Sequence, residues 1–406
     1  MHQRSRGWAA AVALLVCPHL ASAQAGSSLS LDGAITQAVA ANRGLAAARL
    51  AAPVASAAVG VASERLNPDL SYEYARETPH QAIAASFPIE LGGKRQRRIE
   101  LAQTTVAATT AVINRAVVEL RDRVRRGYFA VVTANRRVSL ADDLGSLARR
   151  ARDAAQARFN AGDVPQLEVL TAELALIETD NEASAARGEA RAATTELNVL
   201  LAQPADTVLT LTDGLDLGML PSLASAIAVA SRSNADLLVL DRRIAEQSAR
   251  RDLAQALKSP DVSAGATYTY DAQPEFSHGY RATVGITLPL FTRHTAGVVL
   301  EDAELARLTA ERDATALELS GTVAAALARA TSAKEQLARS TAESLPRAMA
   351  VEQMAQDSYT SGQTGLVVLL QAVQFTRDVR RRNLDAGAEY QRALAELERA
   401  IGAPLP

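Results

Sequence analysis

The sequence contains an internal repeat that extends over almost its whole length. Asn67-Pro68-Asp69-Leu70 returns about 190 residues later as Ser259-Pro260-Asp261-Val262, and Arg158-Phe159-Asn160-Ala161-Gly162 returns about 200 residues later as Ser358-Tyr359-Thr360-Ser361-Gly362. Each half has the pattern of a short helix, a pair of strands, a very long helix, a glycine-centred turn and a second long helix. We therefore divide the chain into a signal peptide at 1–23, a first repeat at 24–204, a connector at 205–221 and a second repeat at 222–406.

The N-terminal segment has the features of a secretory signal peptide. Arg4 and Arg6 precede an apolar core, and Ala21-Ser22-Ala23 provides a small-residue cleavage site. The single cysteine, Cys17, lies inside this segment, so the mature chain has no thiol for a disulfide or a metal site. Lipidation of Cys17 is the alternative, but the residue before it is not the small one that lipoprotein processing prefers.

The composition argues against nucleic-acid binding and catalysis. The formal net charge is −2, so the chain has no electrostatic attraction to a polyanion. The histidines of the mature chain, His80, His278 and His294, are scattered, and no catalytic set appears, so we expect no enzyme, no cofactor and no metal site. No unbroken apolar run of about 18 residues follows the signal peptide, so a membrane would have to be entered by strands.

The strand-like segments alternate between apolar and polar residues. Tyr280, Val284 and Ile286 fall on the apolar side of one run, while Arg281 and Thr283 fall on the polar side. Residues 262–270 provide a partner, and residues 70–74 and 83–91 are the counterparts in the first half. Runs of about nine or ten residues suit tilted membrane strands. The periodicity alone favours a half-buried strand of a soluble sheet. The signal peptide and the long helices reverse this preference and favour strands that point Tyr280, Val284 and Ile286 toward lipid.

The predicted helices are unusually long. Residues 94–159 contain no proline and predict one helix of about 65 residues, or ~100 Å. The second half repeats it at 295–359, with a bend or break expected at Pro346, and continues with a helix at 366–402. An earlier helical segment at 31–66 should be interrupted at Asn42 and kinked or restarted at Pro53. Spacings of three and four residues predict a coiled-coil seam along Leu140, Leu144, Leu147, Ala151 and Ala154, continued by Leu167, Leu170, Leu174 and Ile177.

Four strands in one chain cannot close a barrel, and open sheet edges cannot face lipid. Three chains would supply twelve strands together with a ring of long helices. This plan resembles the TolC family of outer-membrane efflux and secretion channels over essentially the whole mature chain. The resemblance implies a mainly α fold with membrane β-strands, in which a long coiled-coil α-barrel continues a 12-stranded trimeric β-barrel, built on an internal two-fold repeat.

A glycine-rich segment at the expected junction between a strand and a long helix supports this resemblance. Phe87-Pro88-Ile89-Glu90-Leu91-Gly92-Gly93-Lys94-Arg95 is similar to the strand-to-helix junction of CzcC-type members, which serve heavy-metal efflux. Gly92 and Gly93 would let the chain leave the sheet sharply, and Lys94 and Arg95 would begin the helix at the polar boundary of the membrane. The alternative is a simple glycine turn with solvated charges.

The two turns between long helices resemble the family's periplasmic tips, which meet an adaptor protein. The residues concerned are Phe159, Asn160, Gly162, Val164, Tyr359, Gly362 and Thr364. We expect Gly162 and Gly362 to take left-handed conformations and to fix Phe159 and Tyr359 beside the turns; helical hairpins without a partner are the alternative. The aspartates that close this end in some members are missing from residues 367–371, which leaves Glu168, Glu173 and Asp357 as weak gate candidates.

The resemblance implies a homotrimeric channel in the bacterial outer membrane with a long periplasmic helical extension. Its partners would be outer-membrane lipid, a periplasmic adaptor (membrane fusion) protein and an inner-membrane RND pump, and its role a passive exit duct for heavy-metal cations. Multidrug efflux and type I secretion are alternatives, and a non-pore periplasmic coiled-coil protein is a more distant one. A coiled-coil rod has no use for alternating strands placed identically in both halves, so the strands favour the channel.

Overall fold

The computed structural model describes residues 28–215, 218–274 and 276–405, so the expected signal peptide with Cys17 lies outside the described residues. The first half contains β1 (Ser28–Leu29), α1 (Leu31–Ala41), α2 (Arg43–Arg49), α3 (Ala51–Ser63), β2 (Asp69–Tyr74), β3 (Gln81–Ile89), α4 (Lys94–Asn160) and α5 (Gln166–Leu200). The remainder contains β4 (Thr210–Leu211), α6 (Leu223–Ser233), α7 (Ala235–Ala256), β5 (Asp261–Ala272), β6 (Phe276–Thr287), α8 (Thr295–Arg339), the π-helical turn η1 (Ser340–Ser344), α9 (Leu345–Thr360) and α10 (Leu366–Ile401).

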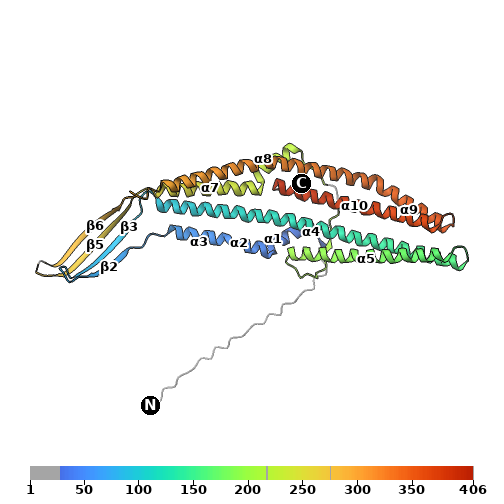
Figure 1. Ribbon diagram of the computed structural model, residues 1–406, viewed down its shortest axis with the longest axis horizontal. Coiled ribbons are helices and arrows are strands. Elements are labelled where there is room, and N and C mark those ends of the chain that lie inside the picture. Colours follow the sequence, from blue (N-terminus) through green and yellow to red (C-terminus); the bar gives the residue numbers. More distant parts are fainter. Residues whose placement is uncertain (1–27, 216–217, 275, 406) are drawn as a thin grey trace, which may run out of the picture.

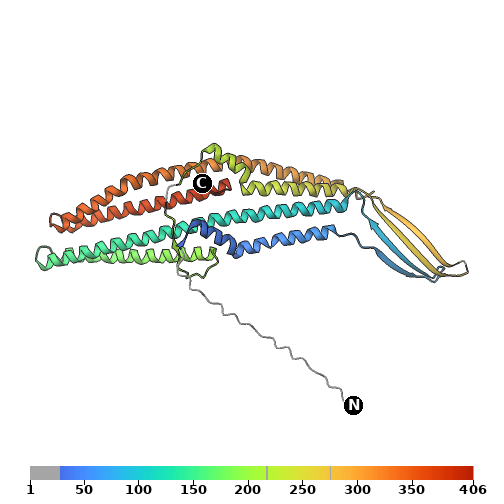
Figure 2. The same ribbon diagram turned by 180° about the vertical axis from the view of Figure 1, so that it is seen from behind.

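The molecule is elongated, with the strands at one end and the two helical turns at the other (Figures 1 and 2). The predicted long helix is confirmed: α4 is continuous over 67 residues and, at 1.5 Å per residue, extends for ~100 Å. It runs from the sheet to the first helical turn and packs along α5, α7, α3 and α10. The sheet and the helical turns are thus separated by the length of one helix.

The short helices are interrupted where the sequence predicts. Asn42 ends α1 and caps α2 through its side-chain oxygen, which accepts a hydrogen bond from the Leu45 N–H (3.0 Å), and Pro53 lies in the first turn of α3. The Asn42 amide also donates to the Leu200 carbonyl oxygen (3.1 Å). In the other half, Asn234 caps α7 and donates to the Ala400 carbonyl oxygen (2.9 Å). The same asparagine contact therefore joins the short and long helices in both halves.

The four longer strands form one antiparallel sheet in the order β2-β3-β5-β6, so β3 and β5 join the two halves of the chain. β5 and β6 have 12 residues each and β3 has nine, but β2 has only six, close to the expected span of residues 70–74. β2 begins after Pro68, which cannot donate a ladder hydrogen bond. It also lies at a sheet edge, where it has a neighbour on one side only. β6 forms the opposite edge.

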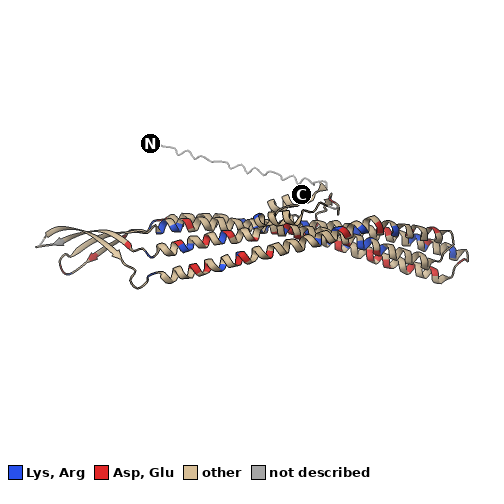
Figure 3. Cartoon of the chain, turned by 90° about the horizontal axis from the view of Figure 1, so that it is seen from above, with Lys and Arg blue, Asp and Glu red and all other residues tan. Residues whose placement is uncertain are grey.

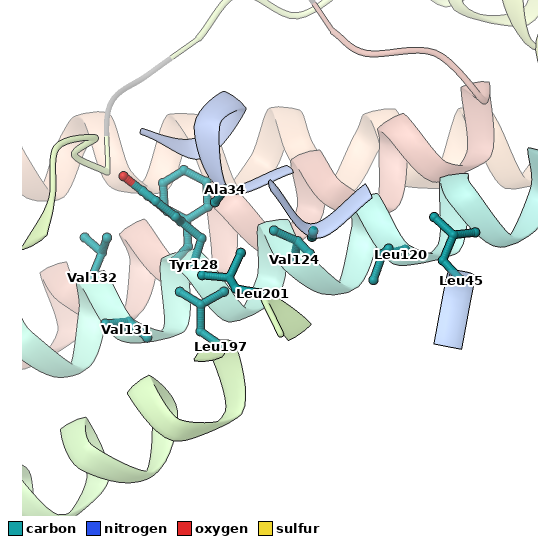
Figure 4. Packing of buried hydrophobic residues seen from close by; sticks show 11 residues of the cluster. Ala34, Leu45, Leu120, Val124, Tyr128, Val131, Val132, Leu197 and Leu201 are labelled. Carbon is teal, nitrogen blue, oxygen red and sulfur yellow. The ribbon is translucent and has the colours of Figure 1, made fainter. Parts of the chain in front are cut away.

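A buried cluster at mid-length joins α4 to the chain segments around it. Leu120, Val124 and Tyr128 of α4 meet Ala34 of α1 and Leu197 of α5 (Figure 4). The Tyr128 hydroxyl donates to the Leu29 carbonyl oxygen (2.8 Å) and accepts from the Thr212 and Asp213 N–H groups. These bonds hold the parallel pair β1–β4 against α4. The sequence analysis treated the region of β4 as part of the connector at 205–221 and did not identify β1, because two residues are too few for periodicity to detect.

Pro346 breaks its long helix, as predicted. The helix that begins at Thr295 widens into the π-helical turn η1, and α9 restarts with Pro346 in its first turn. Proline has no N–H to donate and its ring crowds the preceding turn, which accounts for the break at this position.

The predicted coiled-coil seam is only partly internal. On α4, Leu144, Leu147 and Ala151 are buried. On α5, the expected continuation at Leu167, Leu170, Leu174 and Ile177 is exposed instead. The α5 side that faces α4 carries smaller residues such as Ala172 and Ala183. Spacing alone does not reveal which of two apolar stripes on a helix faces its own chain.

Two segments of the described chain, Arg43–Ser63 and Leu223–Ala256, are long and apolar enough to cross a membrane by length and composition, with mean hydropathies of 1.6 and 1.3. The sequence reasoning missed both, because alanine raises the mean hydropathy without producing an unbroken run of large apolar residues. Each segment is divided between two helices, which lie along α4 and α8 in the helical body. We therefore assign them to that body.

Candidate functional site

The strand register sorts the sheet into an apolar and a polar face. Tyr72, Ile83, Tyr268 and Tyr280 lie opposite one another across all four strands, and Phe87, Ala264 and Val284 form a second row on the same face. Ile286 joins this face beside Val262 and Ile89, because residues two apart on a strand share a side. Tyr280, Val284 and Ile286 are 85%, 75% and 60% exposed. The structure thus places the three predicted lipid-facing residues together on one uncovered apolar face.

The opposite face is polar and small. Ser71, Thr267 and Arg281 form one row, and Gly265 and Thr283 belong to another. Figure 3 shows that charged residues are sparse along the strands and frequent along the helices. A sheet with one apolar and one polar face can separate hydrocarbon from water.

Aromatic side chains gather at the end of the apolar face that lies near the strand turns. The Tyr268 ring lies 5.3 Å from the Tyr280 ring and 5.8 Å from both the Tyr270 and His278 rings, between centroids. The Tyr268 hydroxyl lies 2.7 Å from His278 Nδ1. Tyrosines at the border of an apolar band are typical of an interfacial belt. His278 belongs to β6 and is engaged with this cluster, and within the described residues no group of metal-ligating side chains is found.

The strand-to-helix junction is held by buried and paired charges. Gly92 and Gly93 both take positive φ angles, 69° and 71°, which lets the chain turn from β3 into α4. Lys94 is buried, and its ammonium donates to the Asp261 carboxylate at the start of β5 (2.6 Å). Arg95 donates through Nε to the Ser63 carbonyl oxygen at the end of α3 (2.7 Å). The alternative of solvated charges at a simple glycine turn does not describe this site, because both cations bind distant parts of the chain.

The second half makes the same transition without glycine. His294 precedes α8 with a φ of 55°, a left-handed conformation that costs a non-glycine residue conformational energy. Ahead of it, Leu288, Leu290 and Phe291 are exposed, and Phe291 is fully so. The two strand-to-helix junctions therefore share a left-handed residue directly before the long helix, although the residue types differ.

Both helical turns have the predicted left-handed glycine. Gly162 has a φ of 83° and Gly362 a φ of 73°. The Gly162 N–H donates to the Phe159 carbonyl oxygen (2.9 Å), and the Gly362 N–H donates to the Tyr359 carbonyl oxygen (3.1 Å). Asn160 and both glycines are exposed, while Val164 and Thr364 are half-buried. Phe159 is 39% exposed and accessible beside its turn.

Tyr359 does not present a free surface. It is only 2% exposed and packs between the two hairpins, where its hydroxyl donates to Glu168 Oε1 (3.2 Å) and the Arg158 guanidinium lies over its ring (5.3 Å to the centroid). Burial raises the pKa of the Tyr359 phenol, and the Glu168 carboxylate raises it further, so the hydroxyl stays protonated. Its counterpart Phe159 is partly exposed, and the two turns are therefore not equivalent.

Ion pairs join the hairpins further from the turns. Arg377 of α10 donates to Glu182 of α5 (2.8 Å), and Arg137 of α4 donates to Asp385 of α10 (2.6 Å). The sequence reasoning considered Glu168 only as a weak gate candidate and did not identify these pairs. Their partners lie far apart in sequence, and no short-range spacing connects them.

The chain matches known outer-membrane proteins. The family model for outer membrane efflux protein matches residues 34–203 and again 226–403. The cobalt-zinc-cadmium resistance protein CzcC of Cupriavidus metallidurans is 28% identical over 278 residues, which are 66% of this chain. The chain covers 64% of that relative's length, slightly less than two thirds.

Solved structures of two further proteins share the fold. The outer-membrane channel OprN superposes with a TM-score of 0.73 at 19% identity, covering 92% of this chain and 90% of OprN. CusC, whose structures concern folding and transmembrane channel formation, superposes with a TM-score of 0.73 at 18% identity over 92% of each chain. At these identities the likeness establishes the architecture of sheet, long helices and helical turns.

Proposed function

The chain belongs to the outer membrane efflux protein family, and from this premise we propose that it forms a trimeric exit duct for heavy-metal cations. The protein is an outer-membrane efflux channel. We propose further that it works in a tripartite system with a periplasmic adaptor protein and an inner-membrane RND pump, and that the duct itself is passive. In this proposal the two halves of the chain are structural repeats, because their helices and strands follow in the same order.

The observation that carries the proposal is the four-stranded sheet with two open edges and one apolar face. In a bilayer, each unpaired backbone N–H or C=O group on the open edges of β2 and β6 would cost roughly several kcal/mol, because hydrocarbon offers no hydrogen-bond partner. Pairing β6 of one copy with β2 of the next removes all edges when three copies close a 12-stranded barrel. The apolar face with Tyr280, Val284 and Ile286 then contacts lipid, and the face with Arg281 and Thr283 lines water.

The helical turns are the proposed adaptor contact. They lie at the end of the molecule opposite the sheet, and α4 alone places them ~100 Å from it, far enough to reach well into the periplasm (Figure 1). At the first turn the proposed contact residues are Phe159, Asn160 and Val164, and at the second turn they are Gly362 and Thr364. Tyr359, which is buried, supports the second turn from within.

Heavy-metal cations are the proposed cargo. The curated relative CzcC is named for cobalt, zinc and cadmium resistance, and the junction around Gly92 and Gly93 resembles that of CzcC-type proteins. A wide aqueous duct does not have to coordinate its cargo, so a channel of this kind works without a metal site of its own.

The test is metal and drug sensitivity in a gene-deletion strain. We expect deletion to lower the inhibitory concentrations of cobalt, zinc and cadmium salts, and plasmid-borne wild-type protein to restore them. Dyes and antibiotics serve as the comparison. Altered sensitivity to dyes and antibiotics alone would reject metal export in favour of multidrug efflux.

A further inference from the structure

The connections between the sheet and the helices lie at one level of the molecule, where the strands end and the helices begin (Figure 1). Gly92, before α4, approaches Ser259, before β5, so closely that a Cβ on the glycine would meet the serine side chain. Lys94 donates to Asp261, and Thr287 at the end of β6 lies directly opposite Asp261 in the sheet. We call this level the sheet–helix boundary, and it consists of the four connections at residues 64–68, 90–93, 257–260 and 288–294.

The connection between β6 and α8 continues the apolar face of the sheet beyond the last strand residue. Leu288 follows Ile286 by two residues and is 58% exposed, Leu290 is 64% exposed, and Phe291 is completely exposed. Phe291 precedes α8 and lies on neither a helix nor a strand, so a seam between helices does not account for it. Because this apolar surface is continuous with the face proposed to contact lipid, the same hydrocarbon can remove it from water.

The cations at the sheet–helix boundary fall into two groups. Lys94, Arg95 and Arg98 donate to oxygen atoms of other segments of the chain. Lys258 and Arg293 are exposed instead, and within the described residues neither has an ion-pair partner. Arg293 donates through Nε to a carbonyl oxygen of its own connection (3.3 Å), which uses only one of the five N–H donors of its guanidinium. We call Lys258 and Arg293 the boundary cations.

The surroundings of the boundary cations contain little compensating negative charge. From residue 276 to residue 300 the chain has two arginines and no acidic residue. The acidic residue nearest to Lys258 in sequence is Asp261, which is already engaged in an ion pair. Arg65 of the same boundary is also exposed, but Glu64 precedes it, so we do not count Arg65 among the boundary cations. Lys258 and Arg293 therefore offer positive charge to an anion from outside the chain.

We propose that the sheet–helix boundary binds glycerophospholipid of the membrane, with Phe291 and its neighbouring leucines among the acyl chains and Lys258 and Arg293 on the phosphate groups. A phospholipid carries acyl chains and an anionic phosphate in one molecule, and the boundary places apolar surface and positive charge at the same level. Long basic side chains reach from the edge of the hydrocarbon to the headgroups, and aromatic side chains favour this border. The inference rests on the lipid-facing sheet of the proposed function and adds a ligand at the helical end of that sheet.

Quenching of tryptophan fluorescence by brominated phospholipid tests the position of Phe291. The background is the full-length protein with Trp8→Phe, which removes the single tryptophan of the chain. Phe291→Trp, Val284→Trp and Phe159→Trp are introduced separately, and each protein is reconstituted in vesicles of phosphatidylcholine with or without bromine on the acyl chains. We expect strong quenching at positions 291 and 284, and none at position 159 on the distant helical turn.

The three probes separate failure of this inference from failure of the proposed function. Quenching in Val284→Trp without quenching in Phe291→Trp would overturn lipid binding at the boundary and leave the lipid-facing sheet standing. Absence of quenching in both variants, in vesicles that retain the protein, would overturn the lipid-facing sheet and the inference together. Equal quenching in all three variants would also overturn the inference, because lipid contact would then not be confined to the sheet and its boundary.

Titration of the Phe291→Trp protein in detergent with brominated phosphatidylglycerol tests the boundary cations. Each basic residue near an anionic lipid surface strengthens binding roughly fivefold, so Lys258→Gln together with Arg293→Gln should weaken the apparent affinity roughly thirtyfold. The matched control is Arg136→Gln together with Arg191→Gln, which should leave the affinity unchanged. These two arginines of α4 and α5 are likewise exposed and, in the described chain, have no ion-pair partner.

Circular dichroism of the same samples establishes that the glutamine variants keep their helix content. An unchanged affinity in the boundary variant, or an equal loss in the control variant, would overturn phosphate binding by Lys258 and Arg293. Complete displacement of the lipid by inorganic phosphate at the same concentration would overturn the proposal as well, because the ligand would then be the free anion and the acyl chains would contribute nothing.

Discussion

The two junction glycines predict a difference in stability between two otherwise similar alanine substitutions. Gly92 and Gly93 have φ angles of 69° and 71°, so Gly92→Ala and Gly93→Ala each place an L-residue in the left-handed region, at about 1–2 kcal/mol. A Cβ at Gly93 has open space around it. A Cβ at Gly92 would lie 2.5 Å from the Ser259 Cβ and closer still to its hydroxyl oxygen, and overpacking of this kind adds roughly 1–3 kcal/mol.

Thermal unfolding followed by circular dichroism in detergent measures this difference. We expect the midpoint to fall in the order wild type, Gly93→Ala, Gly92→Ala, because only the last variant combines strain with a clash. Ser259→Gly removes both clashing atoms and should recover most of the additional loss in Gly92→Ala while leaving Gly93→Ala unimproved. Equal midpoints for the two alanine variants, or no recovery with Ser259→Gly, would refute the close approach of Gly92, which follows β3, to Ser259, which precedes β5.

Three further predictions concern the sheet and the turns. Val284→Arg should abolish trimers, because an arginine facing mid-membrane lipid costs about 2–4 kcal/mol in each copy, whereas the Thr283→Arg variant should assemble normally. Equal trimer yields of the two variants on native gels would mean that the two faces of the sheet are misassigned. Gly162→Val together with Gly362→Val should leave trimer abundance unchanged but abolish cross-linking to the adaptor, because a β-branched residue opposes a positive φ angle. Cross-linking at the wild-type level, with normal trimer abundance, would exclude these turns as the adaptor contact. Tyr359→Phe should speed proteolysis at the turns, because it removes a hydrogen bond of about 1 kcal/mol. The wild-type protein should show the same faster cleavage only above about pH 10, because a phenol whose pKa is raised by folding stabilises the folded state below its unfolded pKa and loses that effect as the pH rises through its folded pKa. Unchanged cleavage rates would show that the bond does not hold the hairpins together.

The elements with strong periodicity were predictable from the sequence. The 67-residue helix α4, the break at Pro346 and the left-handed conformations of Gly162 and Gly362 follow from local rules about proline, glycine and helical spacing. The two faces of the sheet likewise follow from alternation, because a strand has a period of two.

Contacts between distant residues were not predictable in this way. Nothing near Lys94 indicates that it binds Asp261, and nothing near Tyr359 indicates that Glu168 of the other hairpin accepts its hydroxyl. Burial of these side chains depends on how the two halves pack, and that packing is a tertiary property. The exposed leucines of α5 illustrate the same limit, because their spacing predicted a seam without identifying the partner.

Native mass spectrometry of the detergent-solubilised protein tests the central claim most directly. A sheet of four strands with two open edges can enter a bilayer only when other copies complete it. We predict particles of three chains, with no folded monomer that retains the sheet. A membrane-extracted monomer with its full strand content would contradict the account.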